Sequence, residues 1–207
     1  MILRPRARRA LVPVCALALA TAFAAPRALG QPAAPYVPTP DALVDTMLQL
    51  AHTGPGDQVV DLGSGDGRIP IRAVSHFGAR SAVGIEIDGA LVQLANEHAR
   101  AAGVADRVRF IEGDLYGADL SEATVVTVYL IPSMMAGVEG KLRAELRAGA
   151  RIVVHDYPFP SWAPESYVEA DSTDKIRATG ETSARFFLYR VPEAPARPAR
   201  SPPGAVR

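Results

Sequence analysis

Apolar residues along the chain follow two alternating patterns. Short continuous apolar runs predict buried strands, and segments in which apolar residues recur every three or four positions predict helices. The runs that read as buried strands span residues 58–62, 81–87, 107–113, 124–131 and 150–157. The segments with helical periodicity span residues 39–51, 68–77, 89–103 and 132–149.

Residues at the helix ends support these assignments. We expect Thr39 to be the N-cap of the first helix and Pro40 its first residue, a position where proline is well tolerated. We expect Asp88 to cap the third helix and Gly103 to end it, since glycine readily adopts the left-handed conformation found after helices. Pro132 is expected to begin the fourth helix.

Two further strands, at 166–176 and 182–191, follow the alternating region with no helix between them. Alternating strands and helices predict a Rossmann-like α/β fold, in which a mostly parallel sheet has helices on both faces. The final two strands predict an antiparallel pair, so we expect a seven-stranded sheet with an antiparallel last strand. Ligands of such sheets bind beyond the carboxyl ends of the strands.

Charge is unevenly distributed, although the chain has 22 basic and 22 acidic residues. Residues 1–30 contain five arginines and no acid, and residues 192–207 contain three arginines and one glutamate, which leaves 14 basic and 21 acidic residues in 31–191. We predict a leader at 1–30, a folded acidic domain at 31–191 and a disordered Pro/Ala/Arg tail at 192–207. An acidic domain favours a basic protein partner and disfavours nucleic acid.

The leader contains an apolar run at 11–25 that follows four arginines. This run is shorter than the roughly 20 residues of a membrane span. It is typical of a secretory signal, and an uncleaved membrane anchor or an Arg-rich transit peptide are the alternatives. We expect the chain to be exported or membrane-anchored through this segment. The only cysteine of the chain, Cys15, lies there as well, so the folded domain has no disulfide framework.

Candidate chemistry begins with the sequence DLGSGDGRI, which follows the first predicted strand. Asp61 ends that strand, and Gly63 and Gly65 allow a sharp turn and close approach of a ligand. The spacing is not that of the dinucleotide fingerprint, because Arg68 stands where that motif has its third glycine. Asp61 and Asp66 would repel a phosphate and would favour a ligand with a cationic amino group or sulfonium.

Two more acidic residues follow the next two predicted strands. Glu86 ends the second strand, where a carboxylate can bind two ribose hydroxyls. Asp114 follows the third strand, where a carboxylate can accept an adenine amino group. A ligand with a cationic amino-acid end, a ribose and an adenine is S-adenosylmethionine. Each acid taken singly is also compatible with ordinary turn chemistry, whereas their recurrence at successive strand ends favours a ligand site.

The sequence resembles the class I S-adenosylmethionine-dependent methyltransferases. More narrowly, it is similar to the small protein-lysine methyltransferases, which include a broad-specificity archaeal enzyme and a mitochondrial enzyme acting on the c-ring protein of ATP synthase. The segments that carry the resemblance are YVPTP (36–40), DLGSGDGRI (61–69), VGIEID (83–88), SEATVVTVYLIP (121–132), KLRAELRAGARIVVHDY (141–157) and FPSWAPE (159–165).

The resemblance implies a cofactor site for S-adenosylmethionine and no metal. It assigns the methionine end, the ribose and the adenine to the three strand-end acids and their neighbours, and it places the segment before the first strand over the methyl-transfer site. The implied cofactor-binding residues are Tyr36, Thr39, Asp61, Gly63, Ser64, Gly65, Glu86, Ile87, Asp114 and Leu115.

A lysine acceptor must be neutral to attack a methyl group, and a desolvated, aromatic-lined channel lowers the pKa of an amine. We therefore expect Tyr36, Tyr129 and Trp162 to line the catalytic site. His155 and Asp156, after the fifth strand, either accept a proton, bind substrate or are satisfied within a loop. The other histidines lack the spacing of metal ligands.

The leading hypothesis is a protein-lysine N-methyltransferase whose substrate is basic or membrane-associated. The alternatives are a methyltransferase acting on a small molecule or lipid, since this fold serves many substrates, and an exported binding module without catalytic activity. The leader and the cofactor predict different locations. The leader predicts export or membrane anchoring, whereas S-adenosylmethionine is a cytosolic metabolite, so catalysis in the cytoplasm or an organelle would suit it better.

Overall fold

A computed structural model describes residues 36–175 and 180–193. Seven strands form one sheet in the order β3-β2-β1-β4-β5-β7-β6. β1 to β5 pair in parallel, and β7 pairs antiparallel with both β5 and β6. The strands are β1 (Gln58–Leu62), β2 (Ser81–Glu86), β3 (Val108–Glu112), β4 (Val125–Val128), β5 (Arg151–His155), β6 (Ser166–Asp171) and β7 (Ser183–Arg190). The predicted fold, including the antiparallel last strand, is confirmed.

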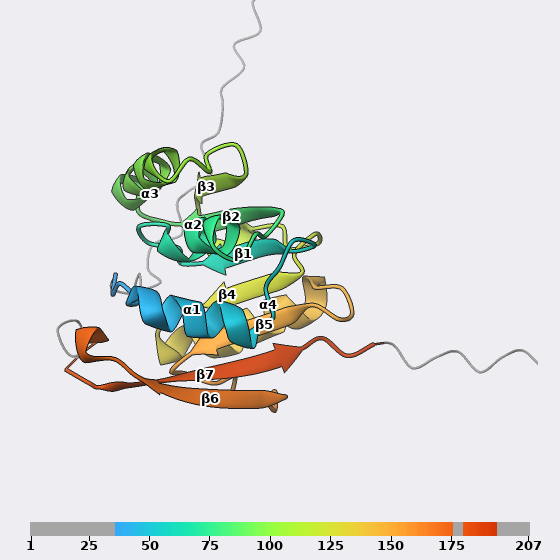
Figure 1. Ribbon diagram of the computed structural model, residues 1–207. Coiled ribbons are helices and arrows are strands. Elements are labelled where there is room, and N and C mark those ends of the chain that lie inside the picture. The colour runs from blue at the N-terminus through green and yellow to red at the C-terminus, as the bar shows by residue number, and fades with distance from the viewer. Residues whose placement is uncertain (1–35, 176–179, 194–207) are drawn as a thin grey trace, which may run out of the picture. The chain divides into compact units, whose positions relative to one another are not determined.

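Helices cover both faces of the sheet (Figure 1). Three of them, α1 (Asp41–Leu50), α2 (Arg68–Ser75) and α3 (Gly89–Ala101), pack in one hydrophobic core, and α4 (Met135–Glu145) packs in another. We call the face under the first three the α1 face and the opposite one the α4 face.

Alternation along the strands assigns side chains to these two faces. In β1, Val59 belongs to the core of the α1 face, whereas Val60 and Leu62 belong to that of the α4 face. Because successive residues of a strand point to opposite faces, Asp61 points to the α1 face. The same rule applied to β4 and β5 directs Thr127 and His155 to the α1 face as well.

Two predicted helix ends differ from the structure. α1 begins at Asp41, and its N-cap is Pro40, whose carbonyl accepts hydrogen bonds from the backbone N–H groups of Leu43 and Val44. Thr39 is therefore not the N-cap, and its hydroxyl lies 3.4 Å from Nδ1 of His155. The segment predicted as one helix from Pro132 starts as a 3-10 turn, and its α-helix ends at Glu145. The Asp88 cap is confirmed, because its side chain accepts the backbone N–H of Ala90.

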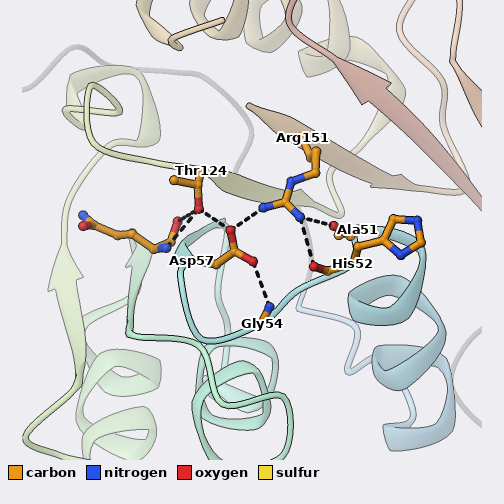
Figure 2. A network of polar contacts seen from close by, with 7 residues as sticks. Ala51, His52, Gly54, Asp57, Thr124 and Arg151 are labelled. Atoms are coloured by element: carbon orange, nitrogen blue, oxygen red, sulfur yellow. Dashed lines mark hydrogen bonds and ion pairs between the residues drawn. The ribbon is translucent and has the colours of Figure 1, made fainter. Parts of the chain in front are cut away.

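A buried polar network fastens the amino-terminal edge of the sheet (Figure 2). Asp57, just before β1, forms an ion pair with Arg151 at the start of β5 and accepts hydrogen bonds from the Thr124 hydroxyl at 2.7 Å and the Gly54 N–H at 2.8 Å. Arg151 also donates to the carbonyl of Ala51 at 2.7 Å, directly after α1. The Asp57–Arg151 pair and its hydrogen bonds thus connect α1 with β1, β4 and β5.

The predicted leader and residues 194–207 of the predicted tail lie outside the described residues. Within 36–175 and 180–193, no helix has both the length and the apolarity needed to cross a bilayer.

Candidate active site

The order of the strands reverses between β1 and β4. The chain runs outward from β1 to β2 and β3 on one side and through β4 to β5 on the other. Open α/β sheets bind ligands at such a switch point, beyond the carboxyl ends of the strands. The acids predicted from the sequence lie close to this switch point, as their positions show.

Asp61 lies at the end of β1 with only 2% of its surface exposed. Its Oδ1 accepts a hydrogen bond of 2.6 Å from the hydroxyl of Thr127 in β4. Burial raises the pKa of Asp61 to about 7, and the negative charges of Glu86 and Asp66 act in the same direction. A buried carboxylate with one hydroxyl donor among the described residues is a good site for a cationic group.

The glycine loop turns directly from β1 towards α2. Gly63 and Gly65 have positive φ angles of 80° and 52°, and the N–H groups of Gly63 and Ser64 donate to the carbonyl of Ile85 in β2. A Cβ on Gly65 would lie 2.6 Å from the ring of Tyr36, so the loop and this ring are in close contact. The hydroxyl of Ser64 is buried and has no hydrogen-bond partner within the described part of the chain.

Glu86 is held rigidly at the end of β2. Its Oε2 accepts the N–H of Gly65 at 2.9 Å, and its Oε1 accepts those of Ile87 at 2.8 Å and Asp88 at 3.0 Å. Each carboxylate oxygen can accept more than one hydrogen bond, so the side chain can still bind a diol. Ile87 beside it is 59% exposed, which suits a residue that packs against a ligand.

Asp114 follows β3 and is exposed. Its side chain accepts the N–H of Tyr116 at 2.9 Å and so caps the 3-10 turn η1 (Leu115–Gly117). Leu115 is buried, whereas one carboxylate oxygen of Asp114 is left for other partners. The structure therefore brings the predicted acids to the carboxyl ends of three adjacent parallel strands.

A covering segment, residues 36–40, lies over the glycine loop and is fastened by Arg68. The guanidinium donates to Asp66 through Nε at 2.9 Å and Nη2 at 2.7 Å, and through Nη1 to the carbonyl of Thr39 at 2.9 Å. Tyr36 is 45% exposed, and burial together with the Asp66 charge raises its pKa. The expectation that Asp66 attracts a cationic ligand is corrected, since its charge is already paired with Arg68.

The role of Arg68 was not foreseen from the sequence, where it only marked a departure from the dinucleotide fingerprint. An arginine two residues after an aspartate at a helix start is a signal for such a pair. A groove of about 570 Å³ borders the covering segment. Its lining residues are Tyr36, Val37, Pro38, Pro40, Asp41, Arg68 and Asp174.

Aromatic and polar groups meet at the ends of β4 and β5. The ring of Tyr129 stacks on the ring of His155, with centroids 3.9 Å apart and an interplanar angle of 28°. Nδ1 of His155 lies 3.4 Å from the hydroxyl oxygen of Thr39. Burial raises the pKa of Tyr129 to about 12 and lowers that of His155 to about 4, so both groups are neutral at pH 7.

Trp162 lies apart from this group. It is buried in the core of the α4 face, packs on Phe159 and Tyr189 with ring centroids 6.0 and 5.6 Å away, and has the guanidinium of Arg143 4.3 Å above its ring. Tyr129 and His155 point to the α1 face. The prediction that Trp162 lines the catalytic site with the two tyrosines finds no support in this geometry, because the sheet lies between them.

Comparisons with known proteins agree with this arrangement. The family profile described as the ANTKMT methyltransferase domain matches residues 61–166. A protein-lysine N-methyltransferase of Saccharolobus islandicus is 35% identical over 78% of this chain and 96% of its own length. An adenine nucleotide translocase lysine N-methyltransferase of Mus musculus is 41% identical over 70% of this chain and 62% of its own length.

A solved structure is also similar. The crystal structure of an RNA methyltransferase from Salinibacter ruber in complex with S-adenosyl-L-homocysteine has a TM-score of 0.67 and 44% sequence identity, and the match covers 78% of this chain and 98% of that one. The resemblance drawn from the sequence motifs is confirmed by these matches. The chain belongs to the ANTKMT methyltransferase domain family of S-adenosylmethionine-dependent methyltransferases.

Proposed function

We propose that this enzyme transfers a methyl group from S-adenosylmethionine to the side-chain amine of lysine in a protein. The observation that carries the cofactor assignment is the row of acids at the ends of β1, β2 and β3, of which Asp61 is buried without a cationic partner among the described residues. The lysine assignment is supported by the names of relatives that match at 35% and 41% identity.

The chain's own residues bind and align the donor. S-adenosylmethionine supplies a methyl group on a sulfonium, which is displaced in line and needs no metal. Asp61 would bind the cationic amino end, Glu86 the ribose hydroxyls and Asp114 the adenine amine, while Gly63 and Gly65 let the backbone approach closely. The ring of Tyr36 over the loop would exclude water from the reacting centre.

The acceptor amine must lose a proton before it attacks. A free lysine side chain has a pKa of about 10.4, so selecting its neutral form at pH 7 costs roughly 4–5 kcal/mol. A desolvated site reduces this cost by favouring the neutral amine. Tyr129 and His155 provide such surroundings, because both are aromatic and neutral at pH 7.

A second acceptor, RNA, is suggested by the name of the Salinibacter protein. The charge balance disfavours it, since residues 31–191 carry 21 acidic and 14 basic groups and phosphate contacts are made mostly by lysine and arginine. The groove beside the covering segment is lined by Asp41 and Asp174 as well as Arg68, which is more suited to a basic peptide than to a phosphate backbone.

The decisive experiment supplies purified protein with methyl-labelled S-adenosylmethionine and a cell extract divided into protein, RNA, and lipid with small metabolites. Label on lysine in the protein fraction, mapped by mass spectrometry, supports the proposal. Label confined to RNA, lipid or metabolites replaces lysine as the acceptor, and no label in any fraction, with cofactor binding retained, favours the non-catalytic binding module.

We also propose that the leader associates the enzyme with a membrane and that its substrate is membrane-associated. The support is the arginine-rich start followed by the apolar run at 11–25. Fractionation of cells expressing the full chain tests this: removal of residues 1–30 should release the protein from the membrane fraction. Unchanged partitioning would contradict the proposal.

A further inference from the structure

The acceptor side of the site can be located relative to the proposed cofactor side. If the proposed function holds, the cofactor extends along the ends of β1, β2 and β3, where Asp61, Glu86 and Asp114 lie. β4 and β5 are the neighbours of β1 on its other side. The residues at the ends of β4 and β5, Tyr129 and His155, therefore lie on the side from which an amine would approach the methyl group.

His155 is held tightly in this position. It is 1% exposed, and its ring contacts those of Tyr129, with centroids 3.9 Å apart, and Phe186, with centroids 4.7 Å apart. Two charged groups face it: the Asp156 carboxylate, which favours its protonation, and the Lys175 ammonium, which opposes it. Burial outweighs both and keeps the imidazole neutral, so one ring nitrogen carries a proton and the other does not.

The neighbours of the ring indicate which nitrogen carries the proton. Nε2 makes no hydrogen bond within the described residues, and Oδ2 of Asp156 lies 3.6 Å from it. That carboxylate is fixed by the Lys175 ammonium at 2.8 Å and the Arg185 N–H at 3.1 Å. A carboxylate on this side favours the proton on Nε2. Nδ1 then has a free lone pair, and it faces the hydroxyl of Thr39 at 3.4 Å.

We propose that His155 is a positioning residue for methyl transfer: its Nδ1 accepts a hydrogen bond from the Thr39 hydroxyl and so directs the lone pairs of the Thr39 oxygen towards the incoming amine. A hydroxyl has one proton to donate and two lone pairs to accept with. When the Thr39 hydroxyl donates its hydrogen bond to His155, the hydroxyl oxygen can only accept hydrogen bonds from other groups. The backbone of Thr39 is fixed independently, because its carbonyl accepts a hydrogen bond from Arg68.

This polarity orients the nucleophile. A neutral amine that donates an N–H to the Thr39 oxygen has its lone pair directed elsewhere, and alignment of that lone pair with the methyl group is what accelerates an in-line displacement. The amine nitrogen forms the new N–C bond while the S–C bond breaks and its electron pair stays on sulfur. The methylated ammonium then releases a proton to water.

The first test is independent of activity. Nitrogen-15 NMR of the labelled full chain distinguishes the two neutral tautomers and the imidazolium, and substitution of each of the four histidines in turn assigns the signals. We expect His155 to be neutral with its proton on Nε2 from pH 5.5 to 8. A proton on Nδ1, or an imidazolium in that range, would overturn the proposal.

The second test measures kinetics on the lysine protein labelled in the extract. His155→Phe keeps a stacked ring without the Nδ1 acceptor, and Thr39→Val removes the hydroxyl. Each should lower kcat about tenfold, as expected for one lost hydrogen bond in the transition state, and His155→Phe should do so without changing the affinity for S-adenosylmethionine. Because both act through one oxygen, the double variant should be no slower than either single variant.

Matched variants separate positioning from general damage. His76→Phe and Thr46→Val alter a histidine after α2 and a threonine whose hydroxyl binds the Ala42 carbonyl, both away from the site, and should leave kcat unchanged. In His155→Gln the amide oxygen can accept the hydrogen bond from the Thr39 hydroxyl, so this variant should be more active than His155→Phe. It remains informative if the phenylalanine variant folds poorly. Additive losses, or wild-type kcat in His155→Phe, would refute the positioning role.

If the wild type methylates no lysine at all, the proposed function fails, while the tautomer measurement still decides the hydrogen-bond polarity.

Discussion

Asp57 and Asp61 lie at opposite ends of the same short strand segment and are both buried, at 7% and 2% exposure, yet their partners differ. Asp57 is paired with Arg151 and also accepts hydrogen bonds from Thr124 and Gly54 (Figure 2). Asp61 accepts one from the Thr127 hydroxyl. At the amino-terminal edge the protein compensates its own charge, whereas Asp61 at the carboxyl edge has no cationic partner among residues 36–175 and 180–193, and we propose that a ligand supplies one.

This difference separates stability from function. A buried carboxylate that is paired inside the protein holds elements together, whereas one without a cation disfavours the folded state when it ionises. The pKa of Asp61 is raised to about 7 by burial, so its favourable contribution to stability is present below the unfolded value of 3.8 and is lost as pH rises through 7. Cofactor binding would reverse that loss.

The largest effect is expected at the amino-terminal edge. Arg151→Met leaves the Asp57 charge buried and unpaired, and should lower the free energy of unfolding by about 3–5 kcal/mol. Urea denaturation measures this, and cofactor affinity of the folded protein should not change. The control is Arg147→Met, which breaks an exposed pair with Glu122 and should cost less than about 1 kcal/mol. Equal losses in the two variants would mean that the buried Asp57–Arg151 pair stabilises the protein no more than an exposed pair does.

The opposite result is expected for Asp61→Asn. The amide keeps the size of the side chain and removes its charge, so cofactor affinity should fall by about 2–5 kcal/mol, or at least roughly 30-fold, in calorimetry. At pH 8 the free energy of unfolding of the cofactor-free protein should not decrease. Asp57→Asn is the matched comparison, with reduced stability and retained affinity. Unchanged affinity in Asp61→Asn would mean that Asp61 and the glycine loop form a structural turn and do not bind the cofactor.

The covering segment gives a smaller and more specific effect. Gly65→Ala and Gly149→Ala both place a side chain at positive φ, 52° and 82°, and each should cost about 1–2 kcal/mol of stability. Gly149 has open space around it, whereas a Cβ on Gly65 would displace Tyr36. Only Gly65→Ala should therefore weaken cofactor binding, by roughly tenfold for a loss of about 1.4 kcal/mol. Equal cofactor affinities in the two variants would show that Tyr36 does not cover the bound cofactor.

The pH dependence of binding gives an effect of similar size for each pH unit. A cationic cofactor prefers the ionised form of Asp61, so affinity should fall by about tenfold for each pH unit below 7 and level off above it. Titration calorimetry between pH 5.5 and 8 measures this slope, and proton uptake by the buffer accompanies binding near pH 7. The slope should vanish in Asp61→Asn, and its persistence there would assign it to another group.

Much of the fold could be predicted because local patterns and global topology agree. Buried parallel strands read as apolar runs, and the helices between them carry the 3.6-residue period, so the sheet followed from the alternation. The carboxylates Asp61, Glu86 and Asp114 were predictable for the same reason, since each directly follows a strand and parallel strands end at one edge.

Contacts between distant segments could not be predicted in this way. The pairing of Arg68 with the Thr39 carbonyl and the proximity of Thr39 to His155, which is 116 residues away, depend on how the covering segment crosses the sheet edge. The packing of Trp162 on the α4 face could not be predicted either, because a residue in a loop follows no helical or strand periodicity that would assign it to one face of the sheet. The Pro40 cap differs from the expected Thr39 cap by one residue, a shift that periodicity cannot resolve.

The central claim is that the carboxyl edge binds S-adenosylmethionine through the acids at the ends of β1, β2 and β3, and a crystal structure of the complex tests it most directly. We predict the amino group of the cofactor at Asp61, its ribose hydroxyls at Glu86 and its adenine next to Asp114 and Leu115, with Tyr36 over the glycine loop. A cofactor bound elsewhere, or a different nucleotide at this edge with no contact to Asp61, would contradict the account.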